Sequence, residues 1–164
     1  MATRDVILGR VLKVRDHPRG SRIWLADVRL GPGDATVQIV FGGLGKVVQP
    51  GCLVPVAPPG SRLPDPGKPN GRKMRRRTYR GETSHGMLCS LAELGWDPTV
   101  TNQVAIFREA PMEPGDSLDD IGSEWPSLVL PPVPDGPAEF QREPGGVDEL
   151  PAGEYEPAGM PGER

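Results

Sequence analysis

A dense run of basic side chains is the feature of this 164-residue chain that is best suited to binding chemistry. Six basic residues fall within the nine positions 72–80. A Lys or Arg that neutralises a phosphate releases condensed counterions, so a strip of this density suits the backbone of a nucleic acid. A solvated charged face, or ion pairing with an acidic part of the same chain, is the alternative. The six residues are Arg72, Lys73, Arg75, Arg76, Arg77 and Arg80.

The residues that follow this strip could contact bases as well as phosphates. A Met87 thioether can lie against a base, and the Ser84 hydroxyl can bond a phosphate or a base edge. Gly86, which carries no side chain, is expected to let a nucleotide approach closely. In the competing interpretation Met87 belongs to the core and Ser84 caps a turn. The next two residues, Leu88 and Cys89, are assigned to the core.

The same stretch carries a family resemblance. The pattern Arg80-Gly81-x-x-Ser84-x-Gly86-Met87-Leu88-Cys89-Ser90-x-x-Glu93-Leu94-Gly95 resembles the tRNA-binding domain of the phenylalanine–tRNA ligase beta chain and of its free-standing relatives. Further segments agree in order and spacing, so the resemblance covers roughly residues 6–121. They are Gly9–Val11, His17–Pro18 with Ile23–Val28, Gln38–Gly43 and Val54–Pro64. The resemblance implies an OB-fold that binds tRNA.

The residues themselves also favour an all-β fold. Alternation in 22–30 puts Trp24, Ala26, Val28 and Leu30 on one face, and a Gly-Pro-Gly-Asp turn separates it from a second strand over 35–41. Further strands are expected over 6–14, 53–57 and 103–107, with Pro55 moving its strand toward a sheet edge. Five short strands predict a five-stranded OB-fold barrel.

One short helix is expected in the body of the protein. Ser90-Leu-Ala-Glu93 is a capping box, in which each side chain bonds the other residue's amide, and Gly95 offers a left-handed stop. This capped helix would fix the chain just after Met87.

Composition divides the chain into two parts. Residues 124–164 hold nine acidic residues and two arginines, a balance of −7, whereas residues 1–123 hold 17 basic and 13 acidic residues, a balance of +4. The C-terminal part also holds nine prolines and six glycines in 41 residues. We therefore expect one OB-fold domain over 1–123 and a disordered acidic tail over 124–164. Its apolar cluster, Trp125 with 128–130, is expected to dock either on the body or on a partner.

We expect no enzymatic activity, metal or cofactor. His85 and Cys89 are four positions apart with a glycine between them, and the two histidines and two cysteines are too scattered for a metal set. No apolar run approaches the roughly 20 residues that span a membrane, and residues 1–5 lack the pattern of a signal peptide. Two cysteines without a paired framework favour a reducing cytoplasm.

The combined expectation is a tRNA-binding protein that docks folded tRNA without chemistry of its own. The partner is tRNA, in company with an aminoacyl-tRNA synthetase or another tRNA-dependent enzyme. The alternative is a protein–protein interaction module that recruits a synthetase and has little RNA affinity. The expected tRNA-binding residues are Arg72, Lys73, Arg75, Arg76, Arg77, Arg80, Ser84 and Met87.

Overall fold

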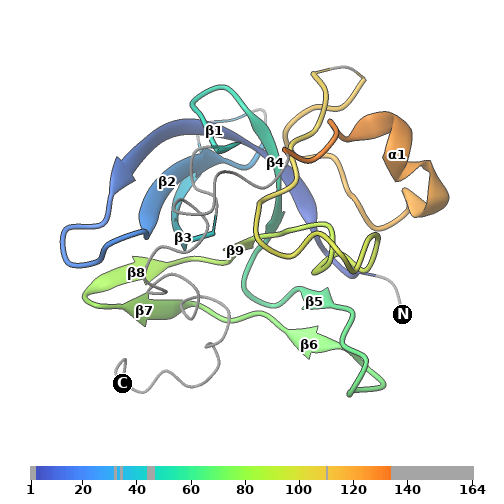
Figure 1. Ribbon diagram of the computed structural model, residues 1–164, viewed down its shortest axis with the longest axis horizontal. Coiled ribbons are helices and arrows are strands. Elements are labelled where there is room, and N and C mark those ends of the chain that lie inside the picture. Colours follow the sequence, from blue (N-terminus) through green and yellow to red (C-terminus); the bar gives the residue numbers. More distant parts are fainter. Residues whose placement is uncertain (1–2, 32, 34, 44–46, 110, 134–164) are drawn as a thin grey trace.

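A computed structural model of the protein describes residues 3–31, 33, 35–43, 47–109 and 111–133. Its centre is a curled five-stranded antiparallel sheet with the strand order β3-β2-β1-β4-β9 (Figure 1). The strands of this sheet are β1 (Ile7–Asp16), β2 (Trp24–Arg29), β3 (Thr36–Phe41), β4 (Leu53–Ala57) and β9 (Met87–Leu88). The predicted all-β, OB-like architecture is confirmed.

Apolar alternation along the strands gives the sheet its inner core. Ala26 and Val28 of β2 are fully buried in one cluster with Ile39, and Trp24 and Leu30 pack against that cluster, as the alternation predicts. Leu25 faces the other way, in a smaller cluster beyond the sheet. Since successive strand residues point to opposite faces, β2 separates two apolar regions.

β4 is an interior strand of the sheet, not an edge strand. All five of its residues are buried. It lies between β1 and β9, which corrects the edge position expected from Pro55. The proline is tolerated because β9 pairs only with Val56 and Ala57, and Pro55 contributes only its carbonyl there, accepting from the Cys89 amide at 3.1 Å.

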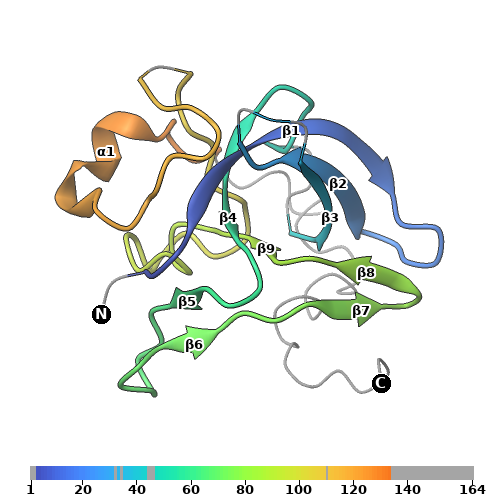
Figure 2. The same ribbon diagram turned by 180° about the vertical axis from the view of Figure 1, so that it is seen from behind.

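The chain between β4 and β9 forms two small hairpins on one side of the sheet (Figures 1 and 2). The first joins β5 (Arg62–Leu63) to β6 (Arg72–Lys73), and the second joins β7 (Arg77–Tyr79) to β8 (Glu82–Ser84). The second hairpin leads directly into β9 and is tied to β3, because the His85 amide donates to the Gln38 carbonyl at 2.9 Å. β3 and β9 thereby approach each other across the curled sheet.

The predicted strand over 103–107 is wrong. Phe107 forms only isolated bridges, one with Leu53 and one with Val129. The backbone of this segment bonds separate partners, with Ala105 donating to Cys89 and Phe107 donating to Leu53. No single strand runs alongside it, so no ladder forms, and β9 supplies the fifth strand of the sheet.

The predicted helix at Ser90 is a set of turns instead, although its capping box is present. The Ser90 amide donates to Glu93 Oε1 at 2.8 Å, and the Glu93 amide donates to Ser90 Oγ at 3.1 Å. Gly95 has the expected left-handed φ of 80°. The chain turns away because the Trp96 and Asp97 amides both bond the Leu91 carbonyl, which closes a compact loop.

The one α-helix in the described part of the chain lies where disorder was predicted. η2 (Gly122–Glu124) leads into α1 (Trp125–Leu128), with Pro126 in its first turn. Val129 is 5% exposed in the core, and Trp125 stacks on Trp96. Residues 124–133 therefore contact the folded body: Trp125, Leu128 and Val129 pack in its apolar cluster, and the Val133 backbone forms two hydrogen bonds with the Gln103 side chain. The remainder of the predicted tail, 134–164, lies outside the described residues.

Candidate nucleic-acid interface

The basic strip is held in place by one buried residue at its centre. Met74 is 8% exposed in the core, and its amide donates to the Ser61 carbonyl at 2.8 Å. Its neighbours Lys73 and Arg75 are both exposed. Alternation about a buried methionine thus turns the flanking cations outward.

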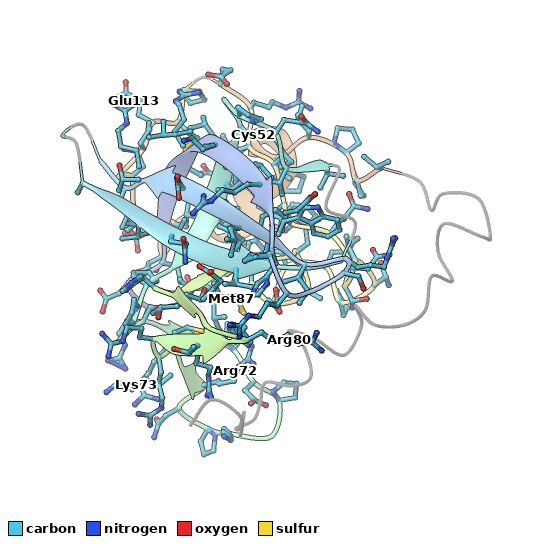
Figure 3. All side chains as sticks on the ribbon, turned by 90° about the vertical axis from the view of Figure 1, so that its left-hand side faces the viewer. Cys52, Arg72, Lys73, Arg80, Met87 and Glu113 are labelled. Carbon is cyan, nitrogen blue, oxygen red and sulfur yellow. The ribbon has the colours of Figure 1, made fainter. Side chains whose placement is uncertain are left out.

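A shallow pocket of about 60 Å³ lies between this strip, the second hairpin and β9. Five of the eight predicted binding residues line it, and they come from both hairpins, from the linker between them and from β9. Figure 3 shows Arg72, Lys73 and Met87 on the same side of the molecule, away from Cys52 and Glu113. The lining residues are Arg72, Lys73, Met74, Arg75, Arg77, Tyr79, Gly86 and Met87.

Two predicted cations lie outside this pocket. Arg76 is exposed on the linker between β6 and β7. Arg80 is exposed at the turn of the second hairpin, where it has a φ of 51° and Gly81 a φ of 92°. Positive φ at both central residues fits a hairpin turn whose twist matches its strands.

Ser84 is placed where it cannot reach a phosphate or a base. It is 1% exposed, its Oγ accepts from the Val40 amide at 2.9 Å, and the same oxygen donates to the Gly86 carbonyl at 2.9 Å. The prediction of direct contact is therefore corrected. The buried hydroxyl joins the second hairpin to β3 and positions the chain before Met87.

Gly86 lines the pocket, and the fold itself also requires a glycine at this position. It has a φ of 123°, and a Cβ there would lie 2.6 Å from the Ala57 carbonyl oxygen and 3.0 Å from Pro58 Cα. The backbone that approaches closely is thus the protein's own, at the end of β4. Met87, the next residue, is half-buried: it packs against the core and also lines the pocket.

Glu93, a half-buried residue of the capping box, has a carboxyl group close enough to Arg72 of the pocket for their charges to interact. Burial raises the pKa of Glu93, and its bonds with Ser90 and the nearby charge of Arg72 only partly offset this effect. Burial also raises the pKa of the Cys89 thiol well above its ordinary value, with Glu93 adding to the effect. Cys89 is fully buried, so its thiol is unsuited to nucleophilic chemistry.

Sequence reasoning missed two residues of this region. Tyr79 lines the pocket and packs against the cluster of Ile23, Leu25 and Val40. Arg19, in the loop between β1 and β2, bonds Arg80 across 61 positions of sequence. The basic strip itself was the available signal for Tyr79, which lies within it. Nothing local predicts the contact of Arg19.

Within the described ranges, no three His, Cys, Asp or Glu side chains gather as a metal-binding group would require. Among those same residues, no helix has the length and apolar character needed to cross a membrane.

Comparison with known proteins points to one enzyme subunit. No model of a known protein family matches the chain. Three curated relatives, all phenylalanine–tRNA ligase beta subunits, are similar to it. That of Symbiobacterium thermophilum is 35% identical over 116 residues, covering 71% of this chain and 12% of the relative. The Salinibacter ruber subunit is 43% identical over 95 residues, covering 55% of this chain and 11% of the relative. The Staphylococcus epidermidis subunit is 38% identical over 128 residues, covering 73% of this chain and 15% of the relative.

This chain is related to one region of that subunit. It spans between about a tenth and a seventh of the length of these relatives. The similarity is therefore a statement about a segment and not about the whole ligase subunit.

Proposed function

We propose that this chain binds tRNA through the cationic surface formed by its two inserted hairpins. The observation that carries the proposal is the pocket, where Arg72, Lys73, Arg75 and Arg77 surround a small hollow beside Met87. In OB-folds the loops after the first and fourth strands commonly bind nucleic acid. Both hairpins lie in the connection that follows β4, the fourth strand. The names of the related ligase subunits support tRNA as the class of RNA.

Charge at the pocket favours a phosphate ligand over internal ion pairing. Among the described residues, Lys73, Arg75, Arg76 and Arg77 form no ion pair with a carboxylate. Elsewhere in the body Arg10 pairs with Glu109, and Arg15 pairs with Asp27. Cations without such partners are available to neutralise phosphates and release counterions.

In this proposal the protein recognises folded tRNA by shape and backbone and does not read the anticodon. It supplies docking energy without catalysing a reaction, and a synthetase or another tRNA-dependent enzyme uses the docked tRNA. We expect it to act in the cytoplasm, where the free thiols of Cys52 and Cys89 stay reduced.

A binding comparison tests the proposal. The full chain is titrated with unfractionated tRNA, duplex RNA and single-stranded DNA at salt concentrations from about 50 to 200 mM. We expect the highest affinity for tRNA, with a steep loss as salt rises. Equal, weak retention of all three nucleic acids would contradict tRNA binding. It would favour the alternative of a protein–protein interaction module that recruits a synthetase.

A further inference from the structure

The loop between β1 and β2 lies beside the tip of the second hairpin (Figures 1 and 2). At this meeting point Arg80 Nη1 donates to the Arg19 carbonyl at 3.0 Å. The Arg19 guanidinium lies across the turn, 3.5 Å from the position that a Cβ on Gly81 would occupy. Two exposed arginines from separate loops are thus held next to each other.

A buried histidine holds this arrangement together. His17 is 3% exposed; its Nδ1 accepts from the Arg19 amide at 2.9 Å, and its Nε2 lies 2.8 Å from the Tyr79 carbonyl oxygen. Because Nδ1 is an acceptor, the ring proton is on Nε2, which donates to Tyr79. His17 therefore bonds the first loop through one nitrogen and the second hairpin through the other.

The two guanidinium groups are not neutralised by the described residues around them. Neither Arg19 nor Arg80 forms an ion pair with a described carboxylate. Glu82, the acidic residue nearest the turn in sequence, accepts instead from Gln38 Nε2 at 3.3 Å. Arg80 also occupies a left-handed backbone conformation that L-residues adopt at a cost. An anion bound beside both groups would be attracted by two positive charges.

We propose that Arg19 and Arg80 form a second phosphate-binding subsite, with His17 as the residue that positions it. The inference rests on the proposed RNA binding and adds the course of the RNA backbone. The backbone runs from the pocket beside Met87, along β7 and β8, to the hairpin tip. A guanidinium offers five N–H donors, so Arg80 retains donors for phosphate after bonding the Arg19 carbonyl.

The experiment uses the full chain, with unfractionated tRNA as the probe. Arg19→Gln and Arg80→Gln are compared with Arg108→Gln, an exposed arginine next to α1 on the opposite side of the molecule. Each of the first two should reduce the slope of log affinity against log salt by about 0.7–0.9, and the double variant by about twice that. Arg108→Gln should leave the slope unchanged.

The positioning role of His17 is tested by combining its substitution with that of Arg19 and comparing the salt slopes. We expect His17→Ala to reduce the slope as much as Arg19→Gln does, with no further reduction when the two are combined. His17→Gln, which retains one donor and one acceptor, should restore the slope. A wild-type slope in a folded His17→Ala variant would overturn the positioning role.

The outcomes separate this inference from the proposed function. The second subsite is refuted if Arg19→Gln and Arg80→Gln both keep the salt slope of the Arg108→Gln control. RNA binding still stands in that case if substitution of Arg75, Arg76 and Arg77 reduces the slope. If wild-type protein does not bind tRNA, the proposed function and this inference fall together. Because Arg19 is exposed, its substitution tests binding without removing core contacts.

Discussion

The indole rings of Trp96 and Trp125 are stacked, with centroids 5.9 Å apart and planes 10° from parallel. Trp96 also meets the edge of Phe107, a fully buried core residue, at a centroid distance of 6.1 Å. Through Trp125, the segment that holds α1 packs against the apolar cluster that includes Leu91 and Leu94 of the capping-box turn. The contacts of the folded body thus extend past residue 123, the predicted end of the domain, to Trp125.

Truncation at the two boundaries should have different effects. Deleting 124–164 removes Trp125 and Val129 from the apolar cluster and should lower the free energy of unfolding by at least about 3–5 kcal/mol, the scale of a buried Trp→Ala change. Deleting 134–164 leaves every described contact in place and should preserve the melting temperature. The melting temperatures of the two truncated proteins are compared. Equal values would show that α1 does not complete the core.

The shorter deletion should also bear on RNA affinity. Residues 134–164 contain eight acidic residues and two arginines, a balance of −6. Their removal lessens repulsion of RNA, so tRNA affinity should stay the same or rise. Loss of affinity in this variant would show that the acidic segment contributes to binding.

Ser84→Ala should weaken the fold through the loss of two internal hydrogen bonds. The change leaves the Val40 amide without its buried partner and should cost about 1–3 kcal/mol of unfolding free energy. Thr78→Ala is the matched control, because its hydroxyl bonds only Thr83 at 3.3 Å on a half-exposed part of the same hairpin. Urea unfolding of both variants is the measurement. Similar stabilities would contradict the structural role of Ser84.

Met87 should affect both stability and binding, since it touches the core and lines the pocket. Met87→Ala should cost about 1–2 kcal/mol of stability, less than the 2–5 kcal/mol of a fully buried methionine. It should also weaken tRNA binding by about 1–3 kcal/mol if a base stacks there. Met87→Leu keeps the volume and is the control for packing. Unfolding and tRNA titration are measured together, and a destabilised Met87→Ala variant with unchanged affinity would remove Met87 from the interface.

Glu93 should make stability depend on pH. Because its pKa is raised in the folded protein, its contribution to stability is greatest below the unfolded-state pKa and is lost as pH rises through the folded-state pKa. Glu93→Gln retains an oxygen to accept from the Ser90 amide but carries no charge. The variant should exceed wild type in stability at pH 7, and the difference should shrink at pH 4. Urea unfolding at both pH values tests this, and a variant less stable at pH 7 would show that the Arg72 charge outweighs burial.

Local sequence patterns predicted the parts of the fold that depend on neighbouring residues. β4 has the predicted bounds of 53–57, and the hydrogen bonds of the Ser90–Glu93 capping box are both present. The missed elements are too short to show a period. The strands β5 to β9 are two or three residues long, and α1 is four residues long in a proline-rich segment. Such elements form only because the rest of the body presents a surface to them.

The candidate site was predictable to a similar degree. The cations of 72–77 could be read from composition, and four of these five line the pocket. The burial of Ser84 could not be foreseen, because its partner Val40 lies on β3, 44 positions away. The meeting of Arg19 with Arg80 depends likewise on the path of two loops through the fold.

The salt dependence of tRNA binding in an Arg75→Gln, Arg76→Gln, Arg77→Gln variant tests the central claim most directly. The control substitutes Arg108, Arg142 and Arg164 by Gln, so that net charge changes equally outside the basic strip. If the three arginines each neutralise one phosphate, the slope of log affinity against log salt should be reduced by about 2–3 relative to wild type. The control should keep the wild-type slope. Equal slopes in the two triple variants would contradict RNA binding by this surface.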